Sequence, residues 1–186
     1  MKDKKYIIFD LDSTLVDSFP TVVNACKRVV EEYAHTAIPS YEFFENYRNS
    51  DMEQMFIDLA KKTKMSQRVF RNYYDKKYSE NFIVGTTPIL KQHEILKMAK
   101  TNGIGIIVLT NKLQRLAEYV CNKLFPDEID IIIGREGTEP IKPRHVMHDR
   151  LQAHNIEAKK QCIIYYGDSI VDEKSAEILS VPFERI

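Results

Sequence analysis

The sequence is poor in cysteine, with only three in 186 residues. Cys26, Cys121 and Cys162 lie far apart within apolar segments, and they show neither metal-site spacing nor a pairing pattern. A disulfide framework is therefore excluded as the source of stability. We expect reduced thiols in or near the core.

The sequence also has no excess of either charge. Lysine and arginine together number 27, as do aspartate and glutamate. No global electrostatic field therefore attracts nucleic acid or an anionic membrane, and we expect neither as a partner. Any anionic ligand has to be bound by local groups.

Long hydrophobic runs are missing as well. The opening MKDKKYIIFDLD turns from basic to apolar, but acids interrupt it after a few residues. This pattern fits neither a signal peptide nor a membrane-spanning helix, so we expect a cytoplasmic protein. The length suits one ordinary globular domain with room for a small second module.

What the sequence does have is a series of short apolar runs that alternate with helical patterns. Runs typical of buried strands occupy 4–10, 104–110, 129–134 and 162–168, with a weaker one at 181–186. Amphipathic patterns at 111–125, 143–155 and 171–180 lie among them. This alternation predicts an α/β fold, a Rossmann-like parallel sheet with helices on both faces. Because the chain ends soon after its fourth run, we expect the last strand to be short.

The segment 16–87 breaks the alternation. It contains several amphipathic helical patterns in a row, at 19–34, 55–62 and 67–82, the last of them opened by Ser66. Gly85 and Pro88 mark its end before a further helix at 89–103. We therefore expect a helical module at 16–87, inserted into an α/β core made of 1–15 and 88–186.

Polar residues follow the predicted strands where each one ends. They are Asp10 and Asp12; Thr110, Asn111 and Lys112; and Asp168 and Asp172. In a parallel sheet these positions share one crevice. Two unit charges 4 Å apart interact by roughly 4 kcal/mol at an effective dielectric of 20, so clustered carboxylates need a cation. Oxygen ligands without His or Cys favour a hard ion, and we expect Mg²⁺.

Groups suited to a phosphoryl anion accompany the acids. Thr110 and Asn111 are candidates to bind phosphate, although both residue types also suit the cap of a following helix. Lys142, in a Lys-Pro pair before a helix, competes with Lys112 for the same anion. Metal, anion site and carboxylate together indicate phosphoryl transfer. A carboxylate at a strand end can attack phosphorus, while a second acid two residues further on transfers the protons.

Four segments in this order, DLDSTLVDS, VLTNK, IKP and YGDSIVD, resemble the motifs of the haloacid dehalogenase superfamily of phosphohydrolases. The helical insert resembles the C1 cap of that superfamily. The TNK triplet and the size of the insert are most similar to the branch of phosphoglycolate phosphatase and β-phosphoglucomutase. One departure is Ser13, which stands where this branch usually has glycine.

The resemblance implies a role for each matching residue. Asp10 is then the nucleophile and Asp12 the general acid and base, whose backbone carbonyl also faces the metal. Thr110 and Lys142 hold the phosphate, while Asp168 and Asp172 bind or orient Mg²⁺ together with Asp10. Asp172 also suits the first turn of a helix as an ordinary acid. Arg48, at the position of a cap specificity loop, is the candidate for substrate specificity, although it also suits an ordinary surface loop.

The predicted function is a Mg²⁺-dependent phosphatase that hydrolyses a small organic phosphate monoester through an aspartyl-phosphate intermediate. A phosphomutase of the β-phosphoglucomutase type is the alternative with the same motifs. A non-catalytic ligand-binding protein of the same fold is a further alternative. The expected partner is a small phosphorylated metabolite, and the expected state is a monomer or weak homodimer.

Overall fold

The computed structural model describes residues 4–34, 36–48, 52–137 and 139–186. The chain divides into two compact units, a core unit of Met1–Asp17 and Thr87–Ile186 and a helical unit of Ser18–Thr86. Strands β2 (Val16–Asp17) and β3 (Thr87–Pro88) pair in an antiparallel ladder and both belong to the core unit. The assignment of the helical unit as a cap stays a prediction.

The core unit is built on one parallel sheet with the strand order β5-β4-β1-β6-β7. Its strands are β1 (Tyr6–Phe9), β4 (Gly105–Leu113), β5 (Ile131–Arg135), β6 (Cys162–Gly167) and β7 (Phe183–Arg185). Strand β1 pairs with a neighbour on each side, which explains why its residues are almost all apolar. The predicted strands and the predicted fold class are confirmed.

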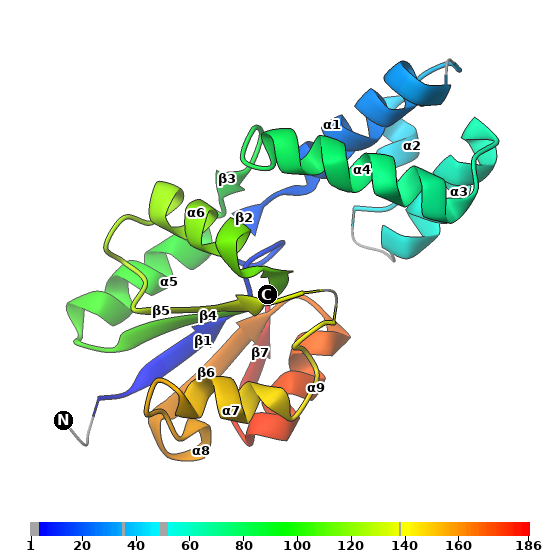
Figure 1. Ribbon diagram of the computed structural model, residues 1–186. Coiled ribbons are helices and arrows are strands. Elements are labelled where there is room, and N and C mark those ends of the chain that lie inside the picture. Colours follow the sequence, from blue (N-terminus) through cyan, green and yellow to red (C-terminus); the bar gives the residue numbers. More distant parts are fainter. Residues whose placement is uncertain (1–3, 35, 49–51, 138) are drawn as a thin grey trace. The chain divides into compact units, whose positions relative to one another are not determined.

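Helices cover both faces of this sheet, as predicted (Figure 1). Helices α5 (Leu90–Thr101) and α6 (Gln114–Leu124) lie on one face. Helices α7 (Val146–Gln152), α8 (Ala158–Gln161) and α9 (Ile170–Leu179) lie on the other. On that second face Ile8 and Tyr165 of the sheet pack with Met147, Leu151 and Leu179, all fully buried.

Strand β4 is longer than the sequence pattern indicates. The helix predicted at 111–125 is present as α6, but its predicted start at Asn111 is wrong, because β4 continues to Leu113, which pairs with Arg135 of β5. The side chain of Gln114 then accepts a hydrogen bond from the Gly134 amide and donates one to the Ile132 carbonyl. These side-chain bonds to β5 take the place of backbone ladder bonds at the point where β4 ends. Thr110 and Asn111 therefore lie in a strand and do not cap a helix.

The helical unit contains α1 (Phe19–Val29), a π-helical turn η1 (Val30–Ala34), α2 (Tyr41–Glu45), α3 (Met52–Thr63) and α4 (Gln67–Asn81). Its own core includes Val29, Phe44, Met55, Leu59 and Phe70. As predicted, Ser66 opens α4, and its hydroxyl accepts a hydrogen bond from the amide of Val69.

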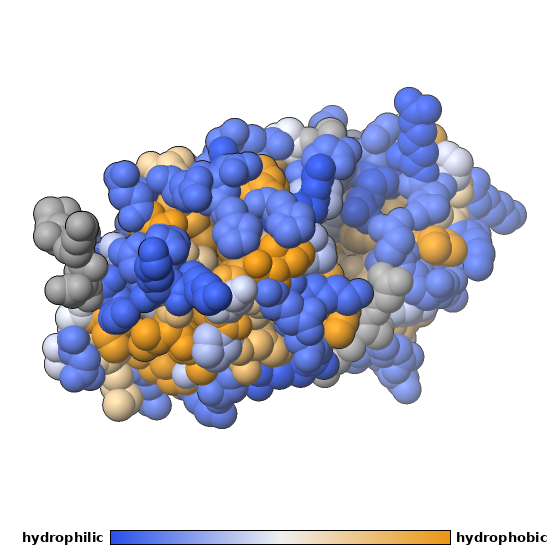
Figure 2. Space-filling view, turned by 90° about the horizontal axis from the view of Figure 1, so that it is seen from below, coloured by the Kyte–Doolittle hydropathy of each residue, from blue (hydrophilic) through white to orange (hydrophobic). Residues whose placement is uncertain are grey.

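All three cysteines are free and buried, which agrees with the expectation of thiols in the core. Hydrophilic side chains cover most of the face shown in Figure 2, with hydrophobic patches between them. Among the helices that the structure describes, none combines the length and apolar character needed to cross a membrane.

Candidate active site

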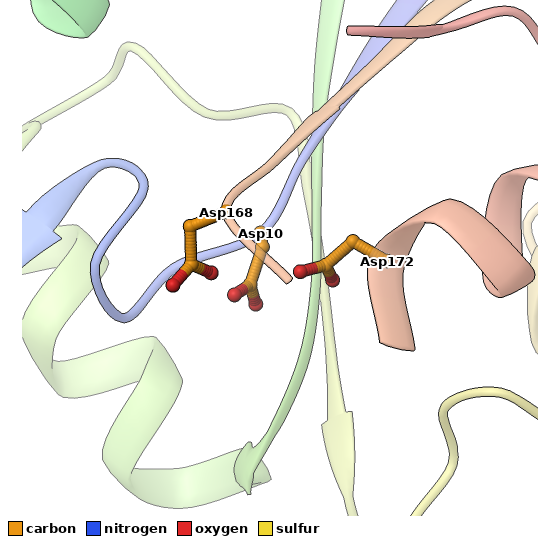
Figure 3. Close-up of side chains that lie close together, drawn as sticks. All are labelled: Asp10, Asp168 and Asp172. Atoms are coloured by element: carbon orange, nitrogen blue, oxygen red, sulfur yellow. The ribbon is translucent and has the colours of Figure 1, made fainter. Parts of the chain in front are cut away.

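Three carboxylates converge at the carboxyl end of the sheet (Figure 3). Asp10 follows β1 directly, Asp168 follows β6, and Asp172 lies in the first turn of α9. One oxygen atom from each carboxylate lies within 4.8 Å of the other two. The topology explains the convergence, because β1 and β6 are neighbours in a parallel sheet and end at the same edge.

Lys142 reaches this acidic cluster from another part of the chain. Its Nζ lies 2.7 Å from Oδ1 of Asp10 and 2.6 Å from Oδ1 of Asp172, and its side chain is only 3 % exposed. Burial lowers the pKa of Lys142, but Asp10 and Asp172 outweigh this effect, so its pKa lies above the usual value. One ammonium opposite three carboxylates leaves two negative charges unbalanced when every acid is ionised.

Two acids of the cluster have raised pKa values because they are buried close to another carboxylate. Burial, with a further contribution from Asp172, raises the pKa of Asp10 to about 7 against the opposing effect of Lys142. Burial and then the nearby Asp172 also raise the pKa of Asp168. Both shifts mean that the folded protein disfavours the fully ionised cluster, and a bound cation relieves this cost.

Asp172 is held by its local structure. Its side chain and that of Ser169 form a capping box at the start of α9, and the Tyr165 hydroxyl donates to Oδ1 at 3.2 Å. A Cβ atom on Gly167 would lie 2.4 Å from the Asp172 Cβ, so glycine makes room for this acid. Asp172 is thus both a first-turn helix acid and a member of the cluster.

Tyr165 is a contributor that the sequence analysis did not select. It is fully buried in β6, and burial places its pKa well above the usual value. A tyrosine within an apolar strand pattern is the sequence signal that could have identified it. A buried tyrosine hydroxyl normally has a hydrogen-bonding partner, which here is Asp172.

Asp12 occupies a different environment. Lys112 Nζ lies 2.8 Å and 3.0 Å from its two carboxylate oxygens. Among the acids that the structure describes, the cluster within 4.8 Å comprises Asp10, Asp168 and Asp172, without the Asp12 side chain. The two lysines are therefore separated, since Lys142 contacts the cluster and Lys112 contacts Asp12.

Thr110 and Asn111 lie on β4, the other neighbour of β1 in the sheet. Thr110 is 1 % exposed, and its hydroxyl oxygen accepts from the Lys112 amide at 3.2 Å, which leaves its O–H to donate to a ligand. Asn111 is hydrogen-bonded to the backbone of Ile141 and Lys142.

Arg48 belongs to the helical unit. Its guanidinium forms an ion pair with Glu45 at 2.9 Å and lies 4.5 Å from the ring centroid of Phe19. These contacts hold the side chain against α1 and α2 of its own unit.

The fold and the cluster define a class, α/β proteins with an acidic centre at the carboxyl edge of a parallel sheet. The chain belongs to the haloacid dehalogenase-like hydrolase family, whose model matches residues 7–185. The predicted family is thereby confirmed.

Individual relatives agree with this assignment. A phosphoglycolate phosphatase of Neisseria gonorrhoeae is 26% identical over 187 residues, covering 94% of this chain and 78% of the relative. A haloacid dehalogenase-like family hydrolase from Streptococcus pneumoniae superposes with a TM-score of 0.76 at 23% identity, over 98% of this chain and 84% of that one. A Thermotoga maritima protein provisionally named β-phosphoglucomutase superposes with a TM-score of 0.71 at 19% identity, over 95% of this chain and 82% of that one.

The two structural matches establish the fold alone at these identities. The family match and the phosphatase relatives together confirm the predicted enzyme class, a phosphatase of the haloacid dehalogenase superfamily.

Proposed function

We propose that this enzyme hydrolyses a small organic phosphate monoester, of the phosphoglycolate type, with Mg²⁺ and through an aspartyl phosphate on Asp10. The observation that carries the proposal is the placement of Asp10, buried at the end of the central strand with Lys142 at 2.7 Å and two further acids within 4.8 Å. The phosphoglycolate phosphatase relatives support the substrate class.

In the first step an Asp10 oxygen attacks phosphorus, and the bond from phosphorus to the leaving oxygen breaks. Asp12 donates a proton to that oxygen, so the alcohol leaves in neutral form. The Thr110 hydroxyl donates a hydrogen bond to a phosphoryl oxygen, and the Lys142 ammonium offsets the negative charge on these oxygens. In the second step Asp12 takes a proton from water, the water oxygen attacks phosphorus, and Asp10 is released with inorganic phosphate.

The donor set fits Mg²⁺. All of its side-chain donors are carboxylate oxygens, which a hard divalent ion prefers, and the unbalanced charge of the cluster equals that of one such ion. Asp10, Asp168 and the Asp12 carbonyl would hold the ion, and Asp172 would bind or orient it. When bound, Mg²⁺ supplies the positive charge that lets an anionic nucleophile approach an anionic substrate.

Asp10→Asn tests the proposal directly, because the amide keeps the shape of the side chain and removes the nucleophile. We expect the variant to fold and to lose at least about 1,000-fold in the rate of phosphate release from a metabolite panel that includes phosphoglycolate. Asp149→Asn, an exposed aspartate of α7, is the matched control and should match the wild type.

Three outcomes separate the alternatives. Retained activity in Asp10→Asn contradicts the nucleophile assignment. Activity that requires a bisphosphate activator indicates a phosphomutase. Failure of the wild type on the whole panel with Mg²⁺ present favours a non-catalytic role.

The proposal extends to specificity and to the state of the enzyme. Arg48→Ala should change the ratio of KM values among the substrates of the panel more than it changes kcat, if the helical unit selects the substrate. A cytoplasmic monomer or weak homodimer is part of the same proposal, and analytical ultracentrifugation across a concentration series measures that state.

A further inference from the structure

The side chain of Asn111 is bound to a backbone segment 30 and 31 positions further along the chain. Its Oδ1 accepts from the amides of Ile141 and Lys142, each at 2.9 Å. Its Nδ2 donates to the carbonyl of Lys142 at 3.1 Å. The amide orientation is therefore consistent, with the oxygen facing two donors and the nitrogen facing an acceptor.

The segment that Asn111 contacts has no ladder or helix to fix it. Ile141 and Lys142 lie outside the helices and strands, and α7 begins only at Val146. Two other anchors hold the segment, since Ile141 is 6 % exposed in the hydrophobic core and the Lys142 ammonium lies between Asp10 and Asp172. Asn111 fixes the backbone between these anchors.

These contacts leave Asn111 little capacity for a substrate. Both lone pairs of Oδ1 and one of the two N–H groups are used. We infer that Asn111 is a positioning residue, which holds the Lys142 backbone so that the ammonium reaches both carboxylates. The inference deepens the proposed function and rests on it for the role of Lys142, and it replaces the expectation that the Asn111 side chain binds phosphate.

Amide hydrogen exchange tests the contacts without substrate or metal. In Asn111→Ala the amides of Ile141 and Lys142 lose their acceptor, so we expect NMR to show their exchange accelerated at least about tenfold. Asn122→Ala, an exposed asparagine on α6, is the matched control and should leave both rates unchanged. Unchanged exchange in Asn111→Ala would overturn the inference.

A double-mutant cycle tests the consequence for Lys142. We expect Asn111→Ala to lower kcat by roughly 10- to 100-fold with a small change in KM, because the misplacement of one catalytic group costs on this order. The double variant with Lys142→Ala should be no slower than Lys142→Ala alone, since Asn111 acts only through that lysine. The opposite result has two parts: the losses in kcat are additive, and Asn111→Ala weakens the binding of inorganic phosphate, measured by calorimetry, in the Lys142→Ala background. That result would show that Asn111 is a direct phosphate ligand and would overturn the inference.

Asn111→Asp serves if the alanine variant does not fold. The carboxylate still accepts from the amides of Ile141 and Lys142, but it cannot donate to the Lys142 carbonyl. Both amides should therefore remain protected from hydrogen exchange. Accelerated exchange of the two amides in this variant would count against the inference. If the wild type releases no phosphate from any substrate, the proposed function fails, whereas the exchange rates still decide whether Asn111 anchors this segment.

Discussion

Ser13 makes the turn after β1 at a conformational cost. Its φ is 62°, in the left-handed region, and its amide donates to the Val16 carbonyl at 2.8 Å. A non-glycine residue loses roughly 1–2 kcal/mol in this region, while glycine loses about 0.5–1 kcal/mol through its freer unfolded state. We expect Ser13→Gly to raise the free energy of unfolding by about 0.5–1 kcal/mol in urea titrations.

Ser79→Gly is the matched control for this turn. Ser79 is exposed within α4, where glycine is about 0.5–1 kcal/mol less favourable than alanine, so Ser79→Gly should lose stability. A Ser13→Gly variant that is no more stable than the wild type would show that the turn carries no such strain.

Gly167 is required at its position by the close approach of Asp172. A Cβ atom there would lie 2.4 Å from the Asp172 Cβ and 2.6 Å from its Cγ, so the acid has to move. We expect Gly167→Ala to cost about 1–3 kcal/mol in stability and to reduce phosphate release strongly. In Gly103→Ala the added Cβ meets no atom within 4 Å, but φ is +71°. That variant should lose stability and keep its activity, and equal activity in both variants would contradict the prediction.

At the scale of elements, Asp130 joins the amino ends of three strands. Its side chain accepts from the Ile106 amide at 2.7 Å and pairs with Lys4 and Lys100 at 2.8 Å and 3.3 Å. Partial burial raises the pKa of Asp130, but the bonds from Lys4, Ile106 and Lys100 outweigh it, so the pKa lies below its usual value. The stability it contributes is therefore complete above the unfolded pKa of about 3.9 and is lost as pH falls through the folded value.

Asp130→Asn isolates the charge, because asparagine still accepts from Ile106. We expect a loss of roughly 0.2–1 kcal/mol per ion pair at pH 7, measured by urea unfolding, since both lysines are partly exposed. The difference between the variant and the wild type should disappear as the pH falls through the lowered pKa of Asp130 in the folded protein. A difference that persists there would show that shape, and not charge, is responsible.

The elements that the sequence predicted are those with a strong local pattern. Apolar runs marked the five strands of the sheet, and Ser66 marked the start of α4. The end of β4 and the β2–β3 pair depend on partners distant in sequence, such as Arg135 for Leu113. No local pattern contains that information.

The candidate site shows the same limit at the scale of the whole molecule. The convergence of Asp10, Asp168 and Asp172 follows from the rule that parallel strands end at one edge, so sequence was sufficient to anticipate it. The partners of each lysine and the contacts of Asn111 and Tyr165 depend on distances of a few ångströms, which topology does not determine.

Magnesium should stabilise the whole molecule if the cluster binds it. Free Mg²⁺ at 100 times its Kd adds about 2.7 kcal/mol to the free energy of unfolding, which corresponds to a rise in Tm of roughly 5–10 °C for a protein of this size. Differential scanning fluorimetry with Mg²⁺ and then excess EDTA measures this rise and its reversal.

Asp168→Asn should abolish most of the rise in Tm, because Asp168 contributes a carboxylate to the cluster. Asp149→Asn on α7 should retain it. An equal rise in both variants would place the stabilising ion elsewhere on the protein, and no rise in the wild type would remove Mg²⁺ from the mechanism.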